Sequence, residues 1–299
     1  MTPDQFHALR QTVDVPSGKI AYAEKGQGPV AVFIHGVPLN GYHWRHALEG
    51  LSDIRRCIAP DMMGLGHTEV APDQPLDFDA QAQMLIEFLD ALGITEIDLV
   101  GNDSGGGIAQ ILATNAPSRI RSLTLTNCDT HDNWPPAAFM PIVQLGKAGK
   151  FGDALAGLLA SPAAARSPAG LGVGFEFPDR LSEDVIAVYL TPLTAAPERR
   201  SQISKYVAVQ DNMQTVRIEN KLKAFDKPTL ILWGDKDVFF ATEWAQWLAK
   251  TIPGTRKVEI LEGAKLFFPE ERPEVFCAAL REHWSPALVD RPTPATAAP

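Results

Sequence analysis

The stretch that decides the fold is Leu99-Val100-Gly101-Asn102-Asp103-Ser104-Gly105-Gly106-Gly107. A short apolar run ends here in glycines and a helical pattern follows, which indicates a strand that turns sharply into a helix. Such a turn exposes one strained side chain and needs small residues two positions before and after it. With Asp103 at the centre, Gly101 and Gly105 fill both positions. With Ser104 at the centre, Asn102 would occupy one of them. We therefore expect Asp103 to be a nucleophile.

This stretch has two other interpretations. A phosphate-binding loop would need the Lys-Ser/Thr ending of a P-loop or a GxGxxG pattern, and the stretch has neither. An ordinary strand–turn–helix in which Asp103 has no chemical role remains the alternative.

The rest of the chain alternates short apolar runs with helical patterns. Strands are expected over residues 19–24, 30–34, 56–59, 97–100, 123–127, 229–233 and 257–261, and helices over 78–92, 106–115, 242–251 and 274–284. This alternation is typical of right-handed crossovers in an α/β protein. We expect a mostly parallel central sheet with helices on both faces.

The pattern changes over residues 131–222, which are rich in Pro, Ala and Gly. Helical patches occur there at 141–159, 182–190 and 198–209, without a convincing strand. We expect a helical cap at 131–222, inserted into a core made of residues 1–130 and 223–287. Residues 288–299, rich in Pro, Ala and Thr, are expected to form a disordered tail.

Composition limits the functional class. The chain has 299 residues, of which 45% are hydrophobic, and a formal net charge of −9. That charge argues against nucleic-acid or anionic-membrane surfaces. The sequence contains no run of about 18 apolar residues, the length needed to span a bilayer. No secretory signal is visible, and the three cysteines lack metal-ligand spacing. We expect a cytoplasmic monomer or homodimer that acts on a small-molecule substrate without metal or cofactor.

Several motifs, in order, resemble the α/β-hydrolase superfamily, specifically its branch of haloalkane dehalogenases and epoxide hydrolases. They are His35-Gly36-Val37-Pro38, Tyr42-His43-Trp44-Arg45, Asp61-Met62-Met63-Gly64-Leu65-Gly66-His67-Thr68, Trp233-Gly234-Asp235-Lys236-Asp237, and Gly263-Ala264-Lys265-Leu266-Phe267 through Glu271-Arg272-Pro273-Glu274. The resemblance covers nearly all of residues 15–285 and implies an α/β-hydrolase fold. It also implies Asp103 as nucleophile, Asp237 as acid, and the backbone N–H groups of Val37 and Ser104 as the oxyanion hole.

The resemblance breaks at one catalytic position. It implies a histidine at 266, where this chain has Leu266. The seven histidines leave none between residues 132 and 282. His131 follows an expected strand and would lie near the pocket, but we favour a surface or hinge role for it. His35, in the HGxP loop, is interpreted as structural.

The missing histidine affects two steps differently. A carboxylate with an ordinary pKa of about 3.9 is ionised at pH 7, so Asp103 would attack an sp³ carbon without a base. Hydrolysis of the resulting ester needs an activated water and would stall unless another group takes over. Glu270 and its neighbour Glu271 are candidates, although we favour reading them as charges at a helix N-terminus. Lys265, like Leu266, is a candidate accessory residue of this loop.

The residues that would set specificity are incomplete. Halide-binding members of the family commonly have Trp after the nucleophile and often Asn in the HGxP loop, where this chain has Ser104 and Val37. Epoxide hydrolases use two cap tyrosines, and Tyr189 and Tyr206 are candidates, although core packing explains them equally well. Asp129 occupies the family's alternative position for the acid.

The sequence therefore predicts a hydrolase that acts on a small, mainly apolar haloalkane, epoxide or ester and can stall at the covalent ester. A cofactor-independent lyase or isomerase, with Asp103 as a proton shuttle, and a ligand-binding protein without turnover are the alternatives.

Overall fold

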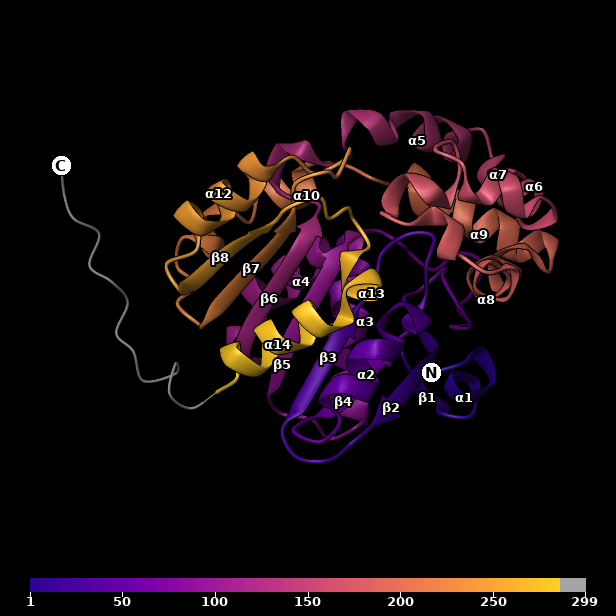
Figure 1. Ribbon diagram of the computed structural model, residues 1–299. Helices are drawn as coiled ribbons and strands as arrows, with labels where there is room; N and C mark the ends of the chain where they lie inside the picture. Colours follow the sequence, from indigo (N-terminus) through magenta and orange to yellow (C-terminus); the bar gives the residue numbers. More distant parts are fainter. Residues whose placement is uncertain (286–299) are drawn as a thin grey trace.

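An eight-stranded sheet forms the centre of the protein in the computed structural model, which describes residues 1–285 (Figure 1). The strands are β1 (Arg10–Val15), β2 (Gly18–Lys25), β3 (Val30–Ile34), β4 (Arg56–Pro60), β5 (Ile97–Asp103), β6 (Ile120–Cys128), β7 (Thr229–Gly234) and β8 (Thr255–Leu261). Their order is β1-β2-β4-β3-β5-β6-β7-β8, parallel from β4 to β8 and antiparallel at the two pairs that involve β2. The expected mostly parallel sheet is confirmed.

Helices cover both faces of this sheet. In Figure 1, α2 (Arg45–Leu51) and α14 (Pro273–His283) lie in front of it and pack against each other. Behind it, α3 (Phe78–Ala91) packs against α4 (Ser104–Asn115), and α4 also contacts β5 and β6. Helix α12 (Thr242–Thr251) packs against β7 and β8. The short helix α1 (Pro3–His7) precedes the sheet, and α13 (Phe268–Glu271) precedes α14.

The long connection between β6 and β7 is helical. Its helices are α5 (Met140–Lys147), α6 (Phe151–Ala160), α7 (Pro162–Arg166), α8 (Glu183–Thr194), α9 (Pro197–Ala208), α10 (Met213–Val216) and α11 (Glu219–Leu222). Helices α5 to α9 gather at one end of the sheet, beyond the carboxyl end of β5 (Figure 1). The helix expected over 141–159 is in fact two, because the chain turns at Gly149, which has a φ of 69°.

Strand β1 is absent from our sequence prediction. Its side chains are all exposed or half-buried, so the apolar alternation that marks a half-buried strand is weak. The tail predicted at 288–299 lies outside the described residues. In the described part of the chain, no helix is both long and apolar enough to cross a membrane.

Candidate active site

Asp103 stands at the sharp turn between β5 and α4, as the glycine pattern predicted. Its backbone φ of 56° and ψ of −134° place it in a conformation that non-glycine residues rarely adopt. A Cβ on Gly101 would lie 2.7 Å from the carbonyl oxygen of Gly105, and one on Gly105 would lie 2.3 Å from that of Ile34. Larger residues at these positions would push the turn out of place, so the glycines hold Asp103 in its strained position.

Two backbone N–H groups fix the carboxylate of Asp103. The N–H of Val37 donates to Oδ2 of Asp103 at 2.9 Å, and the N–H of Ser104 also bonds to this carboxylate. The loop approaches closely because Gly36 has no side chain: a Cβ there would lie 2.0 Å from the same Oδ2. The two donors expected to form the oxyanion hole therefore converge on Asp103.

The side chain of Ser104 lies elsewhere. It is buried, and its hydroxyl accepts a hydrogen bond from the hydroxyl of Tyr206 at 3.1 Å. Ser104 does not line the cavity into which Asp103 opens. Of the two side chains at the turn, Asp103 is the one that lines the cavity.

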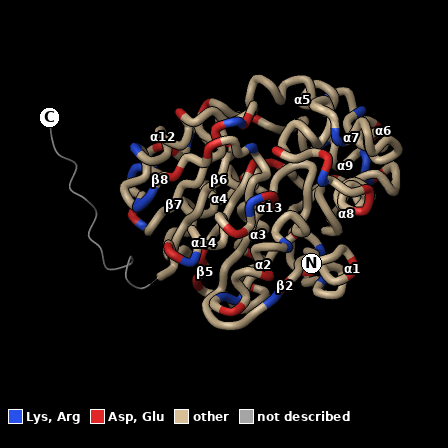
Figure 2. The backbone as a smooth tube through the Cα atoms, viewed as in Figure 1, with Lys and Arg blue, Asp and Glu red and all other residues tan. Residues whose placement is uncertain are grey.

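Asp103 opens into an apolar cavity of about 180 Å³. Helices α5 and α6 contribute one wall, and Figure 2 shows α5 almost without charge. Among the residues that line the cavity within 1–285, the titratable ones are Asp103 and Asp129, and Gln210 adds a polar amide. The apolar lining includes Val37, Phe139, Ile142, Leu145, Phe151, Leu155, Leu158, Phe239, Phe240, Leu266 and Phe267. Such a lining suits a small apolar ligand.

Burial changes the protonation of the site. It raises the pKa of Asp103 to about 8, and the charge of Asp237 adds to this, although the N–H groups of Ser104 and Val37 oppose it. Burial also raises the pKa of Asp237 to about 7 and that of Asp129 well above its ordinary range. Our expectation that Asp103 has an ordinary pKa is therefore wrong, because burial and the charge of Asp237 both raise it.

Asp237 is held by the turn that follows β7. Its Oδ1 accepts the N–H of Phe239 at 2.8 Å, and Asn127 bonds to the same carboxyl. Its Oδ2 is buried without a partner within residues 1–285, and Asp237 does not line the cavity. Because residue 266 is a leucine, Asp237 lacks the imidazole that the resemblance implies it would orient.

Leu266 stands where the resemblance implies that imidazole. Its side chain is buried and lines the cavity, while its carbonyl oxygen accepts the Nδ2 amide of Asn102 at 3.0 Å. Lys265, the preceding residue, does not line the cavity, and its charge lowers the pKa of Asp237.

Neither candidate histidine replaces the missing one. His35 uses both ring nitrogens, because Nδ1 bonds to the Gly36 carbonyl at 2.9 Å and Nε2 accepts the N–H of Met62 at 3.0 Å. Burial lowers its pKa to about 4, which agrees with a structural role. His131 lies off the cavity, paired with Asp132 and Glu219 at 3.2 Å each.

The two candidate tyrosines also lie off the cavity. Tyr206 donates to Ser104, and Tyr189 donates to Oε2 of Glu270 at 2.6 Å. Both are fully buried, so the packing interpretation holds and neither is placed to protonate a leaving oxygen in the cavity.

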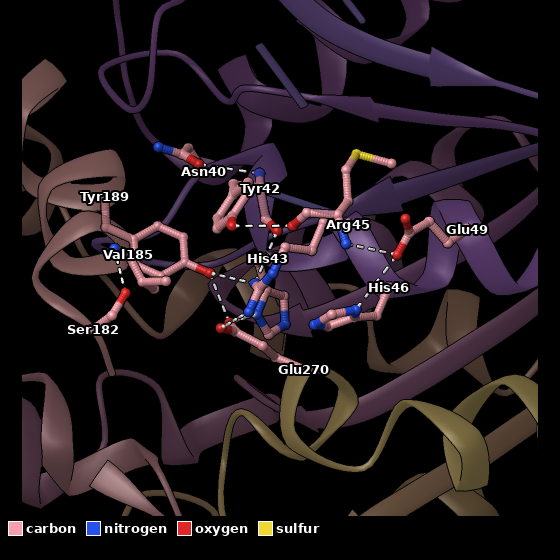
Figure 3. Close-up of polar contacts among 11 residues, drawn as sticks. Asn40, Tyr42, His43, Arg45, His46, Glu49, Ser182, Val185, Tyr189 and Glu270 are labelled. Atoms are coloured by element: carbon pink, nitrogen blue, oxygen red, sulfur yellow. Dashed lines mark hydrogen bonds and ion pairs between the residues drawn. The ribbon is translucent and has the colours of Figure 1, made fainter. Parts of the chain in front are cut away.

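Glu270 forms the centre of a buried ion cluster (Figure 3). Its Oε1 lies 2.8 Å from Nη2 of Arg45, and its Oε2 lies 3.2 Å from Nδ1 of His43. Burial would raise the pKa of Glu270, but Arg45 and His43 outweigh it and lower the pKa to about 2. Glu270 lies in the first turn of α13, as expected, and its charge also joins α13 to α2 and, through Tyr189, to α8.

We expect Glu270→Ala to destabilise the fold by about 3–5 kcal/mol, because it leaves the buried guanidinium of Arg45 without a counter-charge. Urea unfolding followed by circular dichroism measures this. Glu274→Ala, an exposed acid on α14, is the control and should cost less than about 1 kcal/mol. A Glu270→Ala protein of unchanged stability would contradict the structural role.

Several of these groups carry no local mark in the sequence. Asn127 and Gln210 lie outside every motif quoted above, and the motif that contains His43 does not indicate its role. The partners of His43 and Asn127, which are Glu270 and Gly234, lie far away in the chain. Within the described residues, no group of three or more His, Cys, Asp or Glu side chains is arranged to hold a metal ion.

Comparison with known proteins gives a consistent result. A family model described as "alpha/beta hydrolase fold" matches residues 29–271. The chain is 29% identical to haloalkane dehalogenase 2 of Mycobacterium tuberculosis, over 91% of this chain and 93% of that one. It is 28% identical to the cis-3-alkyl-4-alkyloxetan-2-one decarboxylase of Xanthomonas campestris, over 94% and 97%. The structure of the haloalkane dehalogenase DbeA from Bradyrhizobium elkani superimposes with a TM-score of 0.75 at 24% identity, over 91% and 96%.

Proposed function

The chain belongs to the alpha/beta hydrolase fold family, and from this premise we propose that it is an enzyme in which Asp103 attacks an electrophilic carbon and forms a covalent ester. The observation that carries the proposal is the carboxyl of Asp103, held by Val37 and Ser104 on a strained turn and open to an apolar cavity. A carboxylate needs no base to attack an sp³ carbon once it is ionised. The absence of a histidine at 266 therefore does not prevent this first step.

The substrate in this proposal is small and mainly apolar. A cavity of about 180 Å³ lined by aliphatic and aromatic side chains favours such molecules. The names of the relatives point to haloalkanes and to oxetan-2-ones, and both present a carbon with a leaving group. Residues 131–222 act as a cap in this proposal, because α5 and α6 supply one wall of the cavity.

The second step is the slow one in this proposal. Water must attack the carbonyl carbon of the Asp103 ester, and the N–H groups of Val37 and Ser104 would stabilise the oxyanion that forms. General-base assistance is typically worth about 10²–10⁴ in rate. Without an imidazole at 266, we expect the ester to live long enough to be isolated.

A second candidate function is supported by the protonation of the site. With a pKa of about 8, Asp103 both holds and releases a proton near neutral pH. This would suit a cofactor-independent lyase or isomerase in which no ester forms. The likeness to a decarboxylase, which is a lyase by name, favours this candidate as well.

The test of the proposal is the pH dependence of adduct formation. Because only ionised Asp103 attacks and burial raises its pKa to about 8, the ionised fraction rises from about one-tenth at pH 7 to about nine-tenths at pH 9. We expect the rate of alkylation by 1-bromobutane to rise about tenfold between these pH values, as measured by intact-protein mass spectrometry at timed intervals.

Other outcomes discriminate between the candidates. Tryptic mapping should place the added mass on the peptide that carries Asp103. A flat pH profile would contradict attack by a carboxyl with a raised pKa. If bromoalkanes, epoxides, oxetan-2-ones and activated esters all leave the protein unmodified, proton-transfer chemistry or ligand binding replaces the nucleophile.

A further inference from the structure

We infer that Asp129 is a second catalytic carboxyl, which gives a proton to the leaving oxygen when the Asp103 ester forms and takes one from water when the ester breaks down. The inference rests on the proposed role of Asp103 and extends it. It assigns the acid and base work of the missing histidine to a residue of the cavity wall.

The fold places Asp129 and Asp103 side by side. Strand β6 pairs with β5, and Asp129 follows directly after the end of β6. The N–H of Asp129 donates to the backbone oxygen of Asp103 at 3.3 Å, and the amide of Gln110 donates to the backbone oxygen of Asp129 at 2.8 Å. The backbone of Asp129 is therefore fixed beside the nucleophile, and both side chains line the same cavity.

The carboxyl of Asp129 is free for chemistry. Asp129 is 3% exposed, and the Oδ1 atom of its carboxyl has no hydrogen-bond partner within residues 1–285. A buried polar oxygen without a partner is costly, and it is rare unless a ligand, a water or a functional role accounts for it. Asp237, by contrast, is tied to the N–H of Phe239 and lies off the cavity wall. Asp129 is thus the carboxyl that a ligand beside Asp103 would meet.

The protons of this site are shared. Burial and the charges of Asp103 and Asp237 raise the pKa of Asp129 well above its ordinary range. Neighbouring buried carboxyls resist being ionised together, so the cluster tends to keep a proton while one member carries the charge. The reactive form has an ionised Asp103 and a protonated Asp129.

The proposed steps balance with a strained oxygen ring such as an epoxide. The Asp103 carboxylate attacks a ring carbon, the carbon–oxygen bond breaks, and the Asp129 proton moves to the departing oxygen. The products are an Asp103 ester with a free hydroxyl and an Asp129 carboxylate. In the second step, Asp129 takes a proton from water as the oxygen of that water bonds to the ester carbonyl carbon. Asp129 then returns the proton to the departing alkoxide, which leaves a diol, an Asp103 carboxyl that holds one proton, and an ionised Asp129.

The experiment compares two substrates, because a halide leaves without a proton and an epoxide oxygen needs one. Native protein, Asp129→Asn and Asp237→Asn are each mixed with 1-bromobutane or 1,2-epoxyhexane. Formation and decay of the ester are followed by quenched intact-protein mass spectrometry. Asp237→Asn is the matched control, because it removes a carboxyl from the same cluster but outside the cavity wall.

For Asp129→Asn we expect the bromobutane ester to form at least as fast as in the native protein, because a carboxyl that competes with Asp103 for the charge of the cluster is gone. Its decay should slow by about 10²–10⁴, and formation of the epoxide ester should slow on the same scale, the usual effect of losing an acid or base. Asp237→Asn removes the charge that adds to the raised pKa of Asp103, so its effects should shrink at pH 9, where Asp103 is mostly ionised, whereas the losses in Asp129→Asn should persist there.

Three results would overturn the inference. Native decay in Asp129→Asn would exclude Asp129 as the base. Native epoxide opening in that variant would exclude it as the acid. Equal losses in Asp129→Asn and Asp237→Asn would make the effect electrostatic rather than proton transfer. Failure of the nucleophile proposal looks different, since native protein would then form no ester even with bromobutane.

Discussion

Asp103→Asn should slow ester formation with 1-bromobutane by at least about 10³-fold, which is the size of rate loss expected when a nucleophile is removed. The amide is nearly the same size as the carboxyl, and its oxygen can still accept from the N–H groups of Val37 and Ser104. The turn should therefore keep its shape while the attacking carboxylate is lost. Intact-protein mass spectrometry over hours at pH 9, where native Asp103 is mostly ionised, gives the rate.

Ser104→Ala is the matched control for this prediction. The Ser104 hydroxyl is used by Tyr206 behind the turn, so its removal costs one buried hydrogen bond, about 1 kcal/mol of stability. Ester formation should survive as a measurable fraction of the native rate. The opposite pattern, with ester formation lost in Ser104→Ala and kept in Asp103→Asn, would move the chemistry to the serine.

Much of the fold was predictable because its main elements are marked locally. Buried parallel strands are continuous apolar runs, and glycines mark the turn at Asp103. The prediction failed where local marks were weak: β1 exposes or half-exposes every side chain, and the helix expected over 141–159 breaks at Gly149. A single glycine is compatible with a helix interior, so the sequence did not decide that point.

The site was predictable only in part. The position of Asp103 follows from spacing within nine residues, and this is why it was found. The ion cluster around Glu270 joins residues more than 220 positions apart, and no local pattern indicates such a contact. The raised pKa of Asp103 has the same kind of cause. It depends on burial and on Asp237, a residue 134 positions later in the chain (237 minus 103).

The substitution Leu266→His should accelerate breakdown of the Asp103 ester. The structure offers the new ring a defined place, because the hydrogen bond from Asn102 holds the backbone of residue 266 and the side chain already lines the cavity. It also offers unused acceptors, since Oδ2 of Asp237 and Oδ1 of Asp129 are buried and have no hydrogen-bond partner among residues 1–285. An imidazole N–H bonded to either carboxyl would leave the other ring nitrogen to activate water.

The expected gain is about 10²–10⁴, the usual worth of a positioned general base. The full gain should appear when Leu266→His is added to Asp129→Asn, in which ester decay is slowest. The gain should be smaller when Leu266→His is made in the native protein, in which Asp129 already serves as the base. The packing of Phe267 and Phe268, both buried beside residue 266, sets the upper limit, because a displaced ring would not reach the ester. Single-turnover kinetics with 1-bromobutane separate formation from decay in Leu266→His, in Asp129→Asn and in the double variant.

Leu266→Gln is the control, since it adds a polar side chain at 266 that cannot act as a base at neutral pH. Its ester should decay as slowly as that of the Leu266 protein in the same background. The gain in Leu266→His should also fall below about pH 6.5, where an imidazole of ordinary pKa becomes protonated and can no longer accept the proton of water. Equal gains from glutamine and histidine would mean that water entry, and not a base, limits decay. An unchanged ester lifetime in the double variant would mean that position 266 does not reach the ester.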